Sequence, residues 1–227
     1  MGFDKLFAPL EGRPVVAHAI AAFERTQSVE GIIIVGRAEG LSDFEALVAH
    51  EGFGKVSAII PGGARRQDSV RCGLAQVKPE AEFVAVHDAA RPCITDQWID
   101  AVFEAARRDG AAILASPVQA TLKKVDQKKH IAATVDRESL WEAQTPQVFR
   151  RELLIEAYAK RGRDPVTDDA QLIERLGKPV TIVPCSPLNI KITTRDDLKL
   201  AEQVLKVLPK PKLEGFQHPF AGDDLWR

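Results

Sequence analysis

An aspartate and an arginine stand three positions apart in residues 86–92 (VHDAARP), at the end of a short apolar run. If that run is a buried strand, the string lies at its carboxyl end, where open α/β sheets bind ligands. There Asp88 can hold a divalent cation that bridges phosphates, and Arg91 can bind a phosphate or fix the loop through a salt bridge. The plainer alternative is that Asp88 only caps the next turn. We assign His87, which adjoins the strand, to structure.

Residues 62–70 (GGARRQDSV) form a second candidate, a glycine-rich turn that follows one expected strand and enters a helix. Glycines let the backbone approach a ligand closely, and a helix N-terminus favours an anion or the polar edge of a base. The spacing matches neither the dinucleotide-binding motif nor the P-loop. Taken alone, the string is better explained by a tight turn.

Residues 134–137 (TVDR) and 140–147 (LWEAQTPQ) give a third candidate. Arg137 lies at the base of an expected arm and offers a bidentate fork for a phosphate. We expect residues 144–147 to form a polar turn before a helix, and Trp141 to belong to the core.

Thr167 and Lys191 complete the set of candidates. Thr167 precedes two aspartates and predicts the N-cap of a helix that Gly177 closes, and capping alone explains this pattern. Lys191 lies between two isoleucines on an expected strand, which puts one charge on an otherwise buried element. Either that strand is an exposed edge, or the lysine points at an anionic ligand.

Short β-branched runs alternate with segments of helical period, and this alternation predicts the elements that position the candidates. The runs are nearly continuous in hydrophobicity, as in strands buried on both faces. Thr95 and Gly110 predict the two ends of one helix, and Thr194 opens the last helix with a capping box. The pattern predicts an α/β fold with a mostly parallel sheet covered on both faces. The expected strands are residues 31–35, 56–60, 83–86, 111–115 and 180–183.

Two segments break this alternation. Residues 121–135 are polar and rich in lysine, and they predict two strands joined by a turn that projects from the body. Such a hairpin is either simply solvated or an arm that grips a second subunit. Residues 209–227 carry prolines and predict a tail with little structure. The aromatic residues Phe216, Phe220 and Trp226 leave open that the tail docks on the surface.

Length and composition exclude several classes of protein. The 227 residues, 45% hydrophobic and 28% charged, are ordinary for one large globular domain. No run of about 18 apolar residues predicts a membrane span, and no secretory signal opens the chain. The net charge of −1 argues against a general nucleic-acid binder. Cys72, Cys93 and Cys185 are too few and too scattered for a disulfide framework or a zinc site, so we expect a reducing, cytoplasmic location.

Together these strings are far more specific than any one of them. The chain resembles the 2-C-methyl-D-erythritol 4-phosphate cytidylyltransferase family of the non-mevalonate isoprenoid pathway. The matching strings run in order from residue 1 to about residue 208. They are GGARRQDSV, VHDAARP, TVDR, LWEAQTPQ, TDDA and NIKITTRDDL.

The resemblance implies a Rossmann-like, three-layer nucleotidyltransferase fold. It implies one cytidylyltransferase domain over residues 1–208, with a β-arm at about 118–136 that joins a homodimer, and a tail at 209–227. It further implies transfer of CMP from CTP to 2-C-methyl-D-erythritol 4-phosphate, with release of pyrophosphate and a need for Mg²⁺. No nucleic acid or membrane partner is expected.

The resemblance also implies roles for individual residues. Lys5 and Lys191 resemble two catalytic lysines that hold the triphosphate. Arg137 is expected to reach the site of the partner subunit. Gly63 and Ser69 are implied to contact the cytosine and ribose. Asp88 and Ala89 are implied to contact the nucleotide, and Asp88 also the metal. The residues implied to contact the acceptor phosphate are Arg91, Thr121, Thr145 and Thr167.

The sequence departs from the family pattern at its start. The family opens with a strand and a glycine-rich loop that wraps the triphosphate, and the given sequence begins at the last Met-Gly of that loop. We therefore expect weak or no turnover from the 227 residues, compared with a chain extended upstream. Two other interpretations stay open: a ribitol 5-phosphate cytidylyltransferase, and a non-catalytic nucleotide-binding homologue. The small residues beside Asp88, and LWEAQTPQ, favour methylerythritol phosphate as the acceptor.

Overall fold

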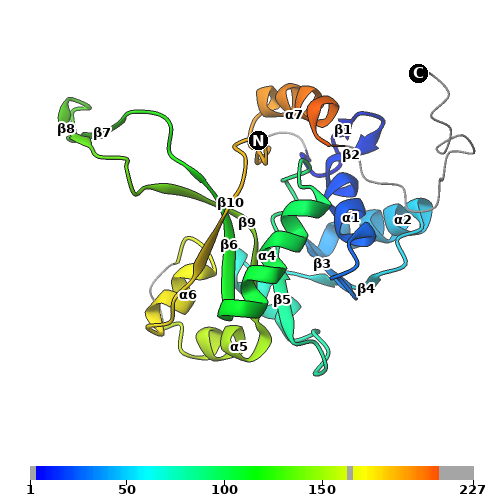
Figure 1. Cartoon of the computed structure of the whole chain (residues 1–227). Helices are drawn as coiled ribbons and strands as arrows, with labels where there is room; N and C mark the ends of the chain where they lie inside the picture. Colours follow the sequence, from blue (N-terminus) through cyan, green and yellow to red (C-terminus); the bar gives the residue numbers. More distant parts are fainter. Residues whose placement is uncertain (1–3, 163–165, 210–227) are drawn as a thin grey trace, which may run out of the picture.

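The computed structural model describes residues 4–162 and 166–209, so most of the expected tail lies outside the described residues. The strands are β1 (Pro9–Leu10), β2 (Arg13–Pro14), β3 (Ile32–Gly36), β4 (Val56–Pro61), β5 (Phe83–Val86), β6 (Ala111–Pro117), β7 (Leu122–Val125), β8 (Ile131–Val135), β9 (Trp141–Arg150) and β10 (Thr181–Pro184) (Figure 1). The helices are α1 (Val15–Arg25), α2 (Leu41–Glu51), α3 (Arg66–Leu74), α4 (Asp96–Asp109), α5 (Arg151–Ala159), α6 (Ala170–Arg175) and α7 (Arg195–Val207), with a 3-10 turn, η1, at Ala38–Gly40.

A sheet in the order β10-β6-β9-β5 forms the centre of the molecule. β10 runs parallel to β6, whereas β9 runs antiparallel to both of its neighbours, so β5, β6 and β10 share one direction. β3 and β4 pair in parallel as a separate two-stranded sheet. The predicted α/β class with a mostly parallel sheet is confirmed. The five strands predicted from the apolar runs, which are β3, β4, β5, β6 and β10, each begin within one residue of the expected start.

β9 is a strand that the sequence pattern did not predict. Residues 144–147, predicted as a polar turn, lie inside this strand, so that prediction is wrong. Gln144, Thr145 and Gln147 are buried polar side chains, and they interrupt the continuous apolar run that marks a strand covered on both faces. Trp141 was expected in the core but is 37% exposed, because it begins β9 where the strand leaves the body toward the arm.

Helices cover both faces of the central sheet. Val148 and Phe149 follow each other along β9 and therefore point to opposite faces. Val148 packs in one cluster with Ile99 of α4, whereas Phe149 packs in another with Leu154 of α5 and Ile173 of α6. The fold thus has three layers, with the sheet between α4 on one side and α5 and α6 on the other.

Most of the predicted helix ends are confirmed. The Thr95 hydroxyl accepts a hydrogen bond from the Trp98 amide, and Gly110 ends α4 in the left-handed conformation, with φ at +87°. Thr194 and Asp197 form the reciprocal capping box at the start of α7.

The start of α6 differs from the prediction. The helix begins at Ala170, with Asp169 at the N-cap in place of Thr167. The carboxylate of Asp168 accepts a hydrogen bond from the Gln171 amide at 3.1 Å, and so takes over the capping that was expected of the threonine. Gly177 follows the helix with φ at +71°, as predicted.

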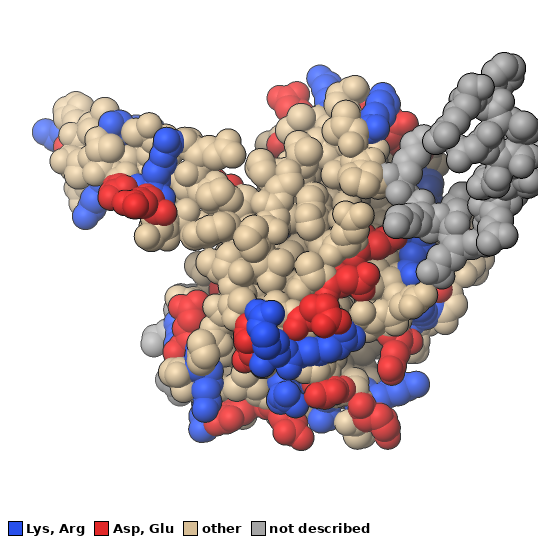
Figure 2. All heavy atoms as spheres, viewed as in Figure 1, with Lys and Arg blue, Asp and Glu red and all other residues tan. Residues whose placement is uncertain are grey.

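The hairpin of β7 and β8 projects from the body, which confirms two strands joined by a turn (Figure 1). Leu122, Val125, Ile131 and Val135 are exposed on it, Ile131 by 66%. Figure 2 shows the hairpin clear of the body, with much of its surface neither basic nor acidic on this face. Within residues 4–162 and 166–209, no helix is long and apolar enough to cross a membrane.

Candidate functional site

Asp88 forms the centre of a cluster of charged side chains. It lies two residues beyond Val86, the last residue of β5, at the carboxyl end of the strand. Its carboxylate lies 2.8 Å from Lys191 Nζ, 3.2 Å from Arg66 Nε and 3.9 Å from Arg91 Nε. Burial opposes the charge of Asp88, but Lys191 and Arg66 outweigh burial and lower the pKa of its carboxyl group to about 2. Asp88 is therefore ionised at neutral pH and holds three cations together.

Arg66 connects this cluster to a second carboxylate. Its guanidinium donates from Nε to Asp88 and from Nη1 to Asp169, the latter at 2.7 Å. The hydroxyl of Tyr158 donates to the other oxygen of Asp169 at 2.5 Å. Although burial disfavours the charged guanidinium, Asp169 and Asp88 together raise the pKa of Arg66. Neither Arg66 nor Asp169 was singled out in the sequence, although both lie inside matching strings.

Lys191 was expected on a strand, and that expectation is wrong. It lies in the irregular segment between β10 and α7. The next amide, of Ile192, donates to the Ala90 carbonyl at 2.8 Å, and Ile192 itself is fully buried. One backbone hydrogen bond and one buried side chain thus fix the segment beside the loop of Asp88. This leaves Lys191 40% exposed and able to reach Asp88.

His87 closes a ring of hydrogen bonds around the same loop. The amide of Asp88 donates to Thr145 Oγ1 at 3.0 Å, and Thr145 Oγ1 lies 3.2 Å from His87 Nδ1. The other ring nitrogen lies 3.2 Å from the Arg91 carbonyl. The carbonyl can only accept, so the ring satisfies all of these contacts when Nε2 carries the proton and Nδ1 accepts from Thr145. Burial lowers the pKa of His87 to about 4, which keeps the ring in this neutral form.

This depressed pKa predicts a stability profile in acid. The unfolded chain takes up a proton on His87 near pH 6.5, but the folded chain takes it up only near pH 4. Between these values the unfolded state binds more protons, so stability falls as the pH is lowered from 6.5 to 4. We expect the wild type to lose about 2–3 kcal/mol more than His87→Gln over this window. Urea unfolding at several pH values measures this, and parallel curves for the two proteins would contradict it.

A cavity of about 220 Å³ lies over the cluster. The structure brings five of the predicted site residues to it. They are Asp88, Arg91, Thr145, Thr167 and Lys191. The lining also includes Arg66 and Asp168, and residues 143, 144 and 147 of β9.

Other predicted residues lie outside this lining. Lys5 is near it, because its Nζ donates to the Ile192 carbonyl at 3.1 Å. Gly63 lies in the turn before α3 and Ser69 lies within α3, and the Gly63 amide donates to the Ser69 hydroxyl at 3.1 Å. Thr121 and Arg137 lie at the base of the hairpin, exposed, and do not line the cavity of their own chain.

Gly63 has a steric reason to be glycine. A Cβ at this position would lie 2.4 Å from the Asp68 Cβ, inside the first turn of α3. Ala89 packs with its methyl group against the cluster that includes Val16 and Phe44. The tight turn that the sequence favoured therefore explains why residue 63 is a glycine. A nucleotide that contacts Gly63 would contact this same turn.

Buried amides of β9 and of the loop before Lys191 hold the walls of the cavity. Gln147 Oε1 accepts from the amides of Asp169 and Ala170, each at 3.1 Å. Asn189 donates to Gln144 Oε1 at 2.9 Å, and its carbonyl accepts from Arg91 Nη1 at 2.6 Å. Each amide thus fixes a charged loop on the rigid sheet, which is the arrangement a preorganised site needs.

These groups define what the cavity can do chemically. Its cations can bind phosphate oxygens and neutralise charge that develops on them. The Thr145 hydroxyl accepts from the Asp88 amide and contacts His87, so it is not a free nucleophile. The lining described here contains no cysteine, serine or histidine. The arrangement favours direct transfer between two bound phosphates over a covalent enzyme intermediate.

Comparison with known proteins agrees with this chemistry. Residues 1–207 match the family model described as IspD, 2-C-methyl-D-erythritol 4-phosphate cytidylyltransferase. The enzyme of that name from Shouchella clausii is 44% identical over 207 residues, covering 90% of each chain, and that from Bacillus cytotoxicus is 45% identical over 208 residues, covering 91% of each. The crystal structure of the Thermus thermophilus enzyme of the same name superposes with a TM-score of 0.77 at 34% identity, covering 89% of this chain and 94% of the other.

The match to the family model and the two bacterial relatives each span about nine-tenths of the chain, and the solved structure shares its fold. The strings that suggested the resemblance carry the charged cluster around Asp88. The chain belongs to the 2-C-methyl-D-erythritol 4-phosphate cytidylyltransferase family.

Proposed function

We propose that this chain transfers CMP from CTP to 2-C-methyl-D-erythritol 4-phosphate. The products are 4-diphosphocytidyl-2-C-methyl-D-erythritol and pyrophosphate, and the reaction belongs to isoprenoid precursor biosynthesis. The observation that carries this proposal is the cluster of Lys191, Arg66 and Arg91 around Asp88 in a cavity at the carboxyl end of β5. Family membership supplies the identity of the two substrates.

The reaction is an in-line displacement at phosphorus. An oxygen of the acceptor phosphate forms a bond to the α-phosphorus of CTP, and the bond from that phosphorus to the bridging oxygen breaks. The electron pair leaves with pyrophosphate. The acceptor phosphate is already an anion, so no general base is needed. Such a transfer depends on positioning and on neutralising charge.

The two lysines suit the triphosphate. Lys191 reaches the cavity and Lys5 lies beside it, held at the Ile192 carbonyl. When phosphate oxygens enter, these ammonium groups can leave their present partners and bind the triphosphate. We assign the cytosine and ribose to the turn of Gly63 and Ser69, and a further nucleotide contact to Ala89.

We assign the acceptor phosphate to Arg91, Thr145 and Thr167, which line the cavity. Thr121 and Arg137 lie on the hairpin, away from the cavity of their own chain. A role for them in catalysis therefore requires the hairpin of one subunit to reach the site of another.

We propose that Mg²⁺ takes part through Asp88. Within the described ranges, no group of three or more His, Cys, Asp or Glu side chains could hold a metal by itself. Mg²⁺ commonly uses one or two carboxylates and completes its shell with substrate phosphates and water, so one ionised carboxylate beside a triphosphate fits. Both oxygens of Asp88 now contact cations, so Lys191 or Arg66 must shift to free one. When bound, the ion would neutralise charge on the phosphates.

We also propose a homodimer joined by the hairpin. Val125 and Ile131 are 50% and 66% exposed there. An isolated two-stranded hairpin is only marginally stable, and a second subunit that covers these apolar side chains would stabilise it. We expect Val125→Asp with Ile131→Asp to give a monomer and to lower turnover by about tenfold or more. Light scattering and pyrophosphate release measure the two effects. Lys128→Gln at the turn is the control, and a dimeric, fully active double variant would contradict the proposal.

A reducing, cytoplasmic location fits the thiols. Cys72, Cys93 and Cys185 are all free, and burial raises the pKa of Cys93 to about 12. A thiol so hard to ionise is a packing group and not a reactive one.

One assay tests the proposed reaction. CTP and Mg²⁺ are incubated with methylerythritol phosphate or with ribitol 5-phosphate, and pyrophosphate is measured. We expect pyrophosphate release with the first acceptor, however weak, to exceed release with the second by at least about tenfold. Calorimetric titration with CTP and Mg²⁺ measures the heat of nucleotide binding. An enzyme should release or absorb heat, whereas a protein that binds no CTP should not. The same assay on a chain extended upstream tests the expectation of weak turnover, and absence of product from both chains would refute the proposed function.

A further inference from the structure

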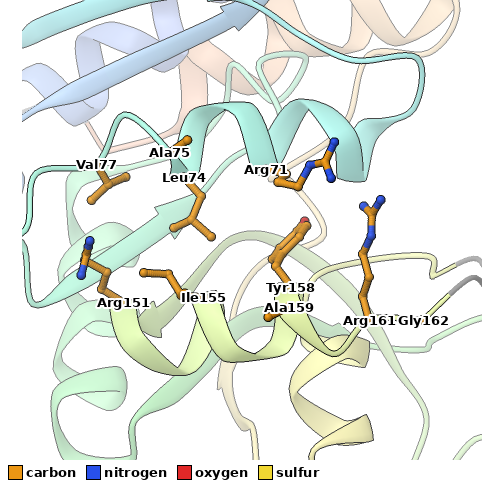
Figure 3. A pocket seen from close by; sticks show the side chains of 10 residues that line it. All are labelled: Arg71, Leu74, Ala75, Val77, Arg151, Ile155, Tyr158, Ala159, Arg161 and Gly162. Atoms are coloured by element: carbon orange, nitrogen blue, oxygen red, sulfur yellow. The ribbon is translucent and has the colours of Figure 1, made fainter.

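A second cavity, of about 690 Å³, lies between α3 and α5 and is distinct from the site above (Figure 3). Leu74 and Ile155 face each other across its middle. Arg71 and Arg161 lie together at one end, and Arg151 lies at the other. Its volume is within the range of small-molecule sites, about 300–1,000 Å³.

Of the three cations that line this cavity, only Arg161 has a counter-charge among the described residues. Arg71 and Arg151 form no ion pair with any residue in the described ranges, and no carboxylate belongs to the lining. Arg161 donates from Nη2 to Asp68 at 3.0 Å, but its Nη1 is buried without a hydrogen-bond partner, as is Nε of Arg151. Buried polar groups without partners are rare and costly, and an anion at the Arg71 and Arg161 end of the cavity would satisfy Nη1 of Arg161.

The middle of the cavity is apolar. Ile155 is 38% exposed, although isoleucine is one of the most strongly buried residue types. Leu74 lies opposite, and Val77 extends this apolar strip toward Arg151. Covering such a surface with an aliphatic chain removes it from water, which favours binding.

We propose that the cavity between α3 and α5 binds an amphiphilic anion, an aliphatic chain that carries a phosphate or carboxylate head group. The head group lies between Arg71 and Arg161, where two guanidinium groups can donate to it at once. The chain lies along Leu74, Val77 and Ile155. A free phosphate lacks the aliphatic chain and a neutral alcohol lacks the anionic head group, so neither should bind well.

Octyl phosphate, below the concentration at which it forms micelles, is the probe, titrated into the full chain by calorimetry. We expect one site, with affinity at least about tenfold above that of inorganic phosphate or octanol. Octanoate distinguishes the head groups: the amphiphile that binds more tightly carries the head group that the cavity prefers, and failure of both to bind overturns the proposal.

Variants locate the binding. Arg71→Gln and Ile155→Ser, both at exposed positions, should each weaken it about tenfold, and circular dichroism checks that they fold. Arg108→Gln on α4 is the matched control and should bind normally. Lys191→Met should also bind normally. Loss of binding in Lys191→Met, or unchanged binding in Arg71→Gln and Ile155→Ser, would place the probe elsewhere and refute the proposal.

Discussion

Lys191→Met should lower kcat/KM for CTP by about 10²–10³-fold, the loss typical of removing one group that stabilises developing charge. The ammonium group lies 2.8 Å from Asp88 and lines the cavity, so it is placed to neutralise the triphosphate. Methionine keeps most of the length and apolar character of the stem. Pyrophosphate release at varied CTP concentration measures the effect.

The control for this substitution is Lys199→Met. Lys199 is 80% exposed on α7 and pairs only with another exposed side chain. We expect its kinetics to match the wild type within about twofold, as for a surface charge outside the site. If Lys191→Met also stayed near the wild-type rate, the role assigned to this lysine would be wrong.

Arg66→Met should lower the free energy of unfolding by about 2 kcal/mol and abolish most turnover. It leaves Asp169, only 1% exposed, without its cation, and removes one of the cations on Asp88. Loss of one partner of a fully buried pair costs more, but Arg66 is 36% exposed, so water compensates in part. Urea unfolding and steady-state kinetics measure the two losses.

Arg65→Met supplies a matched control, because this neighbouring arginine pairs with Asp68 at 55% exposure. We expect this substitution to lower the free energy of unfolding far less than Arg66→Met does, because an exposed ion pair is screened by water. Asp169→Asn keeps an acceptor for Tyr158 and removes the charge, so combining it with Arg66→Met should restore part of the stability. Equal losses in the single and double variants would show that the ion pair is not the cause.

The sequence predicted those parts of the site that follow from position on a strand. Asp88 and Arg91 were placed at the carboxyl end of β5 because the run before them is apolar, and there they lie. Residues whose importance comes from long-range contacts were not found. Arg66 and Asp169 are 103 positions apart, and nothing local distinguishes either from an ordinary cap or a surface charge.

β9 was missed for a related reason. Gln144 and Gln147 are buried because they hold loops of the site, and that use removes the apolar pattern that reveals a buried strand. Lys191 was expected on a strand since isoleucines flank it, but only Ile192 is fully buried. The requirements of the site thus obscured β9 and the segment of Lys191, while the starts of the five apolar strands were predicted within one residue.

The carboxylate of Asp88 gives the cavity an internal counterion. Before any nucleotide arrives, the basic side chains around it are already neutralised in part, so an incoming triphosphate exchanges one set of ionic contacts for another. Affinity for CTP should therefore vary less steeply with ionic strength than three free cations would give. In the absence of Mg²⁺, Asp88→Asn would leave those cations without their counterion and so strengthen the binding of any polyanion, pyrophosphate included.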